Sequence, residues 1–247
     1  MTSEKLVEQL TLMVPEGNGH GNHGEDPQYG LFGAAYLTAS YNNRLGLKDY
    51  DFTISDEPAR EYLDERELKR VFGPEVFEKL TENGFKIDHR DLPSTKEVVQ
   101  DLLKRTHGFF LEAGQQYSNT HSFWVDMFGA ERVVVLPDVA ILPHVQAVIV
   151  GLTEGVLSMC EVVDFLTENK VSKEEARLIA RSVSNIPIGA QAELRKKVEL
   201  EHRLPQKGDL FRAKTDLWPI DPSEIPQDEG GDNSTSSNPA QGNIHWL

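Results

Sequence analysis

The sequence predicts a mainly α fold: a multi-helix globular domain with a few short strands and a disordered acidic C-terminal tail. Long stretches repeat apolar residues at the three- and four-residue spacing of a helix, whereas two-residue alternation, typical of strands, is brief. From Asp216 onward the chain holds six acidic residues and neither Lys nor Arg, a composition typical of disorder. We therefore expect three regions. Residues 1–48 would form an N-terminal helix, a Gly/His loop and a second helix, residues 49–215 the main helical domain, and residues 216–247 the tail.

The N-terminal third is predicted to contain helices and one clear strand. Ser3 can cap a first helix that Pro15 ends, and a second helix is expected over 29–43. Alternation of Tyr50, Phe52 and Ile54 with polar residues predicts a strand. The remaining expected elements here are helices over 56–72 and from Pro74 to about Asn83, and a short strand at 85–87.

The middle of the chain is predicted from two capping boxes and several apolar runs. Ser94 with Glu97 predicts the start of a helix whose apolar period continues through Phe110 to Ala113. Ser172 with Glu175 predicts another helix, ending near Ser184. The other expected elements are an irregular aromatic segment over 117–128, a strand over 132–136, a long central helix over 143–167 and a last helix to about Arg203.

Composition limits the classes of partner. The chain of 247 residues has a net charge of −15, which opposes binding to nucleic acid and to anionic membranes and favours cationic ligands or basic protein partners. A single cysteine, Cys160, excludes an internal disulfide and fits a reducing, cytoplasmic compartment. No signal-peptide pattern is expected over residues 1–9. The most apolar segment, 139–160, contains polar residues that favour a buried core helix over a membrane span.

The glycine-rich segment 17–26 concentrates candidate metal ligands. His20, His23 and Glu25 lie within six positions, and imidazole nitrogens with carboxylate oxygens bind Zn, Fe, Mn or Cu. A more distant ligand, for which His121, His144 and Glu154 are the candidates, would have to complete the set. The alternative interpretation is a solvated loop whose glycines and asparagines form turns.

The same segment fits the dinucleotide-binding pattern G-x-G-x-x-G over Gly19–Gly24. Leu10–Val14 would be the preceding strand, and the helix over 29–43 would follow. Three observations oppose this hypothesis. Pro15 and Glu16 precede the glycines, Glu25 and Asp26 occupy the place of the phosphate charge, and the rest of the chain is predicted to lack alternating strands and helices.

Two further segments suggest catalytic residues. Glu154 and Glu161 would lie about 20° apart on the predicted central helix among apolar residues, a setting suited to an acid or base. The alternative is that they form the solvated stripe of that helix. His121 lies in the aromatic segment, which would suit a ligand pocket. Alternatively, His121 or His107 would bind haem iron.

We therefore expect an enzyme or ligand-binding protein with a small-molecule ligand, possible dependence on a divalent metal or haem, and oxidoreductase-like chemistry. In that hypothesis Glu154 and His121 would be catalytic, and His20, His23, Glu25 and His144 would bind the metal. The alternatives are a non-catalytic interaction module whose acidic tail recruits a basic protein, and a dinucleotide-binding protein.

Overall fold

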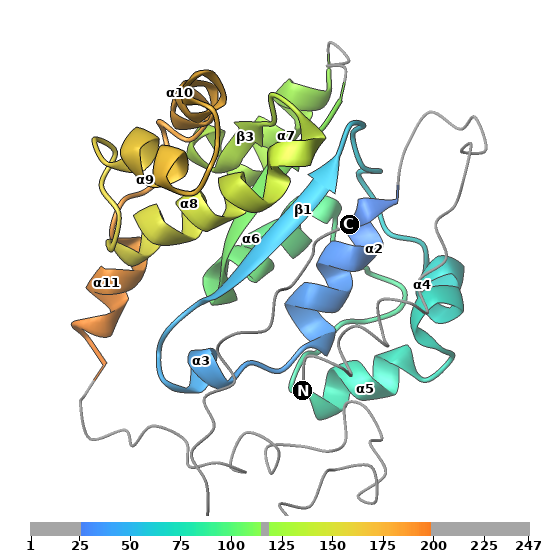
Figure 1. Cartoon of the computed structure of the whole chain (residues 1–247). Coiled ribbons are helices and arrows are strands. Elements are labelled where there is room, and N and C mark those ends of the chain that lie inside the picture. The colour runs from blue at the N-terminus through green and yellow to red at the C-terminus, as the bar shows by residue number, and fades with distance from the viewer. Residues whose placement is uncertain (1–25, 115–118, 199–247) are drawn as a thin grey trace, which may run out of the picture.

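The computed structural model describes residues 26–114 and 119–198 (Figure 1). Its centre is a parallel three-stranded sheet in the order β1-β2-β3. β1 spans Asp49–Ser55, β2 spans Thr106–Glu112 and β3 spans Val133–Val135. β2 is central and every one of its residues is buried, so both faces of the sheet are covered, as parallel sheets require.

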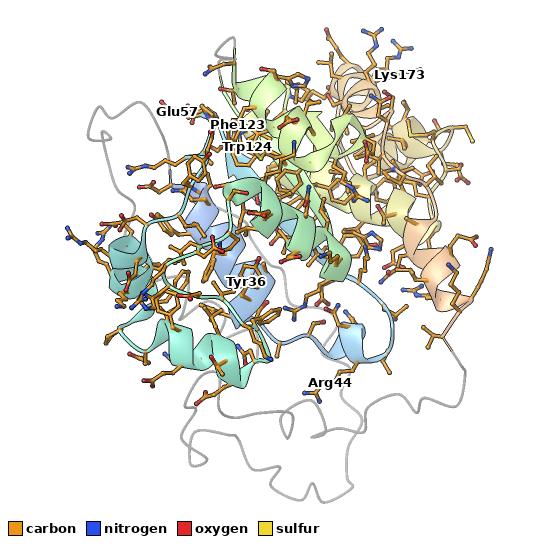
Figure 2. The ribbon with its side chains drawn as sticks, turned by 180° about the vertical axis from the view of Figure 1, so that it is seen from behind. Tyr36, Arg44, Glu57, Phe123, Trp124 and Lys173 are labelled. Atoms are coloured by element: carbon orange, nitrogen blue, oxygen red, sulfur yellow. The ribbon has the colours of Figure 1, made fainter. Side chains whose placement is uncertain are left out.

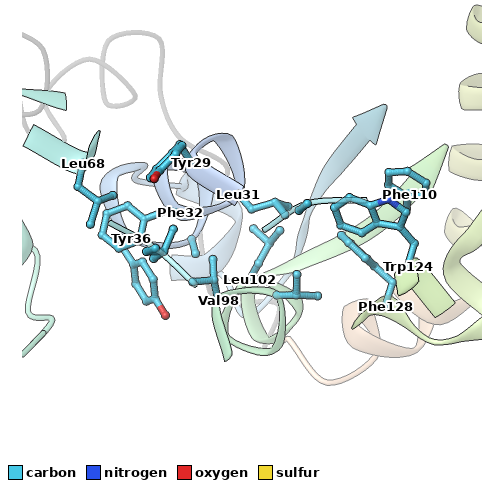
Figure 3. Packing of buried hydrophobic residues seen from close by; sticks show 14 of the residues in the cluster. Tyr29, Leu31, Phe32, Tyr36, Leu68, Val98, Leu102, Phe110, Trp124 and Phe128 are labelled. Atoms are coloured by element: carbon cyan, nitrogen blue, oxygen red, sulfur yellow. The ribbon is translucent and has the colours of Figure 1, made fainter. Parts of the chain in front are cut away.

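One face of the sheet supports the first hydrophobic core. Phe110 of β2 points into this core, where it meets apolar residues of the helices that precede β2 and of the helix that follows it (Figure 3). The elements on this face are α2 (Pro27–Phe32), the π-helical turn η1 (Gly33–Leu37), α4 (Glu65–Phe72), α5 (Val76–Glu82), α6 (Thr95–Arg105) and α7 (Thr120–Phe128). The short α3 (Tyr41–Arg44) leads into β1.

The opposite face supports a second core. Phe109 and Leu111 of β2 point into it, because neighbouring side chains of a strand face opposite ways. A 3-10 turn, η2 (Ala130–Arg132), precedes β3. The elements after β3 are the turn η3 (Val139–Ile141), α8 (Leu142–Glu154), α9 (Val162–Glu168), α10 (Lys173–Ser182) and α11 (Ala190–Arg195). The described chain is thus mainly helical, as predicted, but its helices form two layers around a parallel sheet.

The predicted helix over 94–113 is wrong in its second half. The Ser94–Glu97 capping box is present, but α6 ends at Arg105 and Thr106 is already extended, with φ −129° and ψ 157°. A central strand is apolar on both faces and has no two-residue alternation, so its residues can continue a helical period by coincidence. Gly108 fits this position because a Cβ there would lie 2.9 Å from the Leu103 side chain.

The predicted central helix over 143–167 is two helices. α8 ends at Glu154 and is capped by Gly155, whose left-handed φ of +70° favours glycine, and α9 begins at Val162. Glu161 accepts a hydrogen bond from the Ser158 backbone amide (2.9 Å) in the intervening turn. Glu154 and Glu161 therefore do not share one helix face. Cys160, at the end of the apolar segment expected to form a buried core helix, is exposed in the turn.

The remaining helices and strands agree with the predicted ones in some segments and differ in others. The strands at 50–54 and 132–136 are confirmed in position, as is the Ser172–Glu175 capping box that begins α10. The aromatic segment is a regular helix, α7, rather than irregular, and 85–87 is not a strand. The helix expected over 29–43 is divided between α2, η1 and α3, and the helix expected over 56–72 begins only at Glu65.

Contrary to the sequence analysis, strands and helices do alternate along the described chain, from β1 through α4–α6 to β2, and through α7 to β3. Among the described residues, no helix has the length and hydropathy needed to span a membrane. The predicted first helix, the Gly/His loop and the acidic tail over 216–247 lie outside the described residues.

Candidate functional site

The carboxyl ends of the three strands lie at one edge of the sheet. β1 ends at Ser55, β2 at Glu112 and β3 at Val135, and the register pairs Ser55 with Glu112 and Glu112 with Val135. Open parallel sheets bind their ligands at this edge, because the loops and helix N-termini that follow the strands converge there. Ionisable and polar side chains at this edge are therefore candidates for a functional site.

Glu112 ends the central strand with a buried carboxyl group. Its side chain is 1% exposed, and Oε2 lies 2.8 Å from Nδ1 of His121, whose side chain is 51% exposed. The other carboxyl oxygen, Oε1, is buried and has no hydrogen-bond partner among the described residues. A buried polar atom without a partner costs about 1–3 kcal/mol.

Helix α7 holds His121 in place through contacts with the loop that follows β1. Thr120 Oγ1 donates to the Asp56 carbonyl (3.2 Å), and Trp124 Nε1 donates to the Glu57 carbonyl (3.0 Å). The Trp124 ring stacks on Phe110 of β2 with centroids 4.1 Å apart, and Figure 2 shows Glu57 beside Trp124. Because His121 lies one turn before Trp124, these contacts place its imidazole beside Glu112.

The pairing determines which ring nitrogen of His121 bonds to Glu112. When Nδ1–H donates to the carboxylate of Glu112, the second nitrogen, Nε2, is left as a hydrogen-bond acceptor. A carboxylate that orients a histidine in this way is the arrangement by which enzymes prepare an imidazole to accept a proton. The pair therefore combines a buried carboxyl group with a half-exposed imidazole.

Glu154, the other residue predicted to be catalytic, lies at the opposite end of the sheet. Its Oε1 accepts a hydrogen bond from the Tyr50 hydroxyl (3.1 Å) at the amino end of β1, and its Oε2 lies 2.6 Å from Arg195 Nη2 of α11. Burial, followed by the charge of Glu154, raises the pKa of Tyr50. The structure therefore does not bring Glu154 and His121 together. It places Glu154 in a contact that joins α8, β1 and α11.

His107 lies in a second polar group near this amino end. It is buried, and its Nε2 lies 2.9 Å from Oε1 of Gln191, whose Nε2 donates to the Lys48 carbonyl (2.9 Å). Burial lowers the pKa of His107, and the hydrogen bond to Gln191 opposes that shift only in part. These bonds connect β2, the entry to β1 and α11. They fit a structural role rather than the haem-ligand role considered for His107.

The lowered pKa of His107 predicts an acid-dependent loss of stability. The unfolded chain takes up the proton below about pH 6.5 while the folded protein resists it, so this contribution is complete above that pH and is lost as the pH falls through the lowered folded value. We expect the urea midpoint of the natural chain to fall more between about pH 7.5 and 5.5 than that of His107→Gln. An equal fall in both proteins would contradict this assignment.

The predicted metal ligands are only partly within the described residues. His144 lies in the first turn of α8, where its Nδ1 is buried and has no partner in the part of the chain that the structure describes. Within residues 26–114 and 119–198, no three His, Cys, Asp or Glu side chains form a group that could hold a metal ion. His20, His23 and Glu25 lie outside the described residues.

Glu112 is the residue that the sequence analysis missed. Glu112 falls within the predicted helix over 94–113. A single exposed glutamate near the end of a helix does not indicate a functional site. The available signal was its place directly after a buried apolar run, Gly108-Phe109-Phe110-Leu111, because an acidic residue at the carboxyl end of a buried strand is a frequent site residue.

Comparison with known proteins identifies no relative for this chain. No protein-family model, no curated protein and no solved structure gives a significant match.

Proposed function

We propose that this protein is an enzyme that binds a small molecule at the carboxyl edge of its sheet and uses Glu112 and His121 as a proton-transfer pair. The observation that carries the proposal is the buried carboxyl group of Glu112, which holds an accessible imidazole with one oxygen and leaves the other without a partner among the described residues. In this assignment His121 is the general base or acid, and Glu112 orients it.

A second histidine–glutamate pair in the same protein shows what an ordinary surface contact looks like. His89 Nδ1 lies 3.5 Å from Glu65 Oε2, and the Glu65 side chain is 35% exposed. Water can satisfy the Glu65 carboxylate, and such pairs contribute little to stability. Glu112 differs because its carboxyl group is almost completely shielded from water. Buried polar groups without partners occur at functional sites more often than elsewhere in a protein.

The pair favours a particular kind of ligand. A ligand hydroxyl group or a bound water can donate to Nε2 of His121, whose side chain is half exposed, while Glu112 holds the ring from its buried side. Such a ligand would be a neutral or cationic small molecule, since the chain carries a net charge of −15. The reaction class that follows is proton abstraction from a ligand hydroxyl or water, as in hydrolysis or addition–elimination.

A metal-assisted reaction at the same edge is the second candidate. Asp26, the first described residue, pairs with Arg60 (2.9 Å) in the loop that follows β1, so the chain enters the described fold close to this loop. The sequence hypothesis that His20, His23 and Glu25 bind a divalent metal remains a proposal. In that case Glu112 or His121 would supply the distant ligand that the set requires.

The test is a ligand screen with two matched histidine variants. We expect a panel of small alcohols, esters, amides, dinucleotides and divalent metals to contain compounds that raise the melting temperature of the natural protein. His121→Asn should remove those shifts, while His89→Asn, which alters a similarly exposed histidine beside a glutamate, should keep them.

Each group of compounds in the panel answers a separate question. Shifts with organic compounds alone support the proton-transfer proposal, and shifts that also require a metal support the metal-assisted form. Shifts in melting temperature that persist fully in His121→Asn would mean that the ligand binds elsewhere, and would contradict the assignment of this pair.

A further inference from the structure

The outer edge of β1 carries backbone groups that no described residue satisfies. The Ser55 carbonyl accepts from the Ala113 amide (3.0 Å), so the peptide groups of Ser55 and of every second residue before it point toward β2. The amides and carbonyls of Tyr50, Phe52 and Ile54 therefore point outward. Among the described residues none bonds to them.

An open edge of this kind is unfavourable for a monomeric protein. β1 is seven residues long, and the Ile54 side chain on it is 42% exposed. A long edge with apolar side chains pairs readily with any available strand, and natural proteins cover or interrupt such edges. In Figure 1, β1 lies at the outside of the sheet, with β2 and β3 behind it.

The connections within the sheet indicate which strand belongs at this edge. The chain crosses from β1 to β2 and from β2 to β3 on the same face, the one that holds α6 and α7, and each crossover moves one strand in the same direction. α2 lies on that face too, and it precedes β1. A crossover through α2 has the same hand as the other two only if the strand before α2 lies beyond β1, at its open edge.

The path of the chain agrees with that position. A parallel strand beside β1 would end at the carboxyl edge of the sheet, and α2 begins at Pro27, where Asp26 pairs with Arg60 of the loop after β1. The N-terminal segment before Asp26 contains one run with strand character, Leu10-Thr11-Leu12-Met13-Val14. The residues between Val14 and Asp26 are enough to connect the end of such a strand to α2.

We propose that residues 10–14 dock on the open edge of β1 as a fourth parallel strand. The backbone groups of this segment pair with those of Tyr50, Phe52 and Ile54, and the sheet order becomes 10–14, β1, β2, β3. This inference concerns the architecture and holds whether or not Glu112 and His121 are catalytic. In this arrangement the segment that follows Val14 starts at the carboxyl ends of the strands, where Glu112 lies.

Amide hydrogen exchange and inter-strand NOEs in the full-length chain test this arrangement. We expect the amides of Tyr50, Phe52 and Ile54 to be protected about 100-fold or more, and residues 10–14 to show NOEs to β1. Proline at Thr11 or at Leu12, whichever of the two faces β1, should remove that protection. Asp51 and Thr53, which bond to β2, serve as internal controls, and Thr2→Pro serves as the matched terminal variant.

The other outcomes overturn the inference. Unprotected amides at Tyr50, Phe52 and Ile54 in the full-length chain would show that the edge is open. NOEs from Ile244–Leu247 would identify the C-terminal segment as the occupant, and protection that disappears on dilution would identify a second copy of the chain. If both proline variants fail to fold, the NOEs of the unaltered chain decide the question.

Discussion

Trp124→Ala is expected to lower the free energy of unfolding by about 3–5 kcal/mol, a large part of the stability of a typical domain. The Trp124 side chain is fully buried and contacts the rings of Phe110, Phe123 and Phe128. Its removal leaves a cavity between α7 and β2 and also leaves the Glu57 carbonyl without its donor. Urea unfolding followed by circular dichroism measures the change.

The matched control for this substitution is Tyr62→Ala. Tyr62 is also a large aromatic residue, but it is 71% exposed, so we expect a change within about 0.5 kcal/mol. Because Trp124 positions α7, its replacement should also weaken any ligand binding that depends on His121. A loss below about 1 kcal/mol for Trp124→Ala would contradict the central place of this residue in the core.

Glu112→Met is expected to keep or raise stability while abolishing ligand binding. Methionine has a similar length and no polar atoms, so it removes a buried carboxyl oxygen that lacks a partner among the described residues, worth about 1–3 kcal/mol. His121 loses its partner, but its half-exposed imidazole can bond to water instead. Functional residues often reduce stability in this way.

Glu154→Met provides the contrast for that prediction. Glu154 accepts a hydrogen bond from the Tyr50 hydroxyl and forms an ion pair with Arg195, although its Oε2, like Oε1 of Glu112, is buried and has no hydrogen-bond partner among the described residues. Its replacement leaves the partly buried Tyr50 hydroxyl unpaired and should lower stability by about 1 kcal/mol. The urea midpoint of Glu154→Met should therefore fall, whereas that of Glu112→Met should rise or stay the same. A loss above about 2 kcal/mol for Glu112→Met would mean that Glu112 serves the fold rather than a ligand.

Local signals predicted the parts of the fold that local interactions determine. The capping boxes at Ser94 and Ser172 are satisfied within four residues, and both helices begin where the sequence predicts. β1 was predicted because Tyr50, Phe52 and Ile54 alternate with polar residues in the sequence. β2 was missed because it is buried on both faces and is stabilised by pairing with β1 and β3, which no local pattern reveals.

The candidate site was predicted in part for a related reason. His121 was identified from its aromatic surroundings, and those rings do form the contacts that position α7. Glu112 could not be paired with it while β2 was assigned to a helix. Glu154 was singled out for its apolar neighbours, but its partners Tyr50 and Arg195 are distant in the sequence and only the tertiary structure brings them together.

The most direct test of the Glu112–His121 pair is the protonation pattern of the His121 imidazole, measured by ¹⁵N NMR at about pH 8, where free imidazole is neutral. We expect that in the unaltered protein the proton resides on Nδ1 and Nε2 is free to accept. We also expect Glu112→Met, which offers Nδ1 no acceptor, to move the proton toward Nε2. A His121 imidazole with its proton on Nε2 in the unaltered protein, unchanged by Glu112→Met, would contradict the assignment of this pair as a base held by a buried carboxylate.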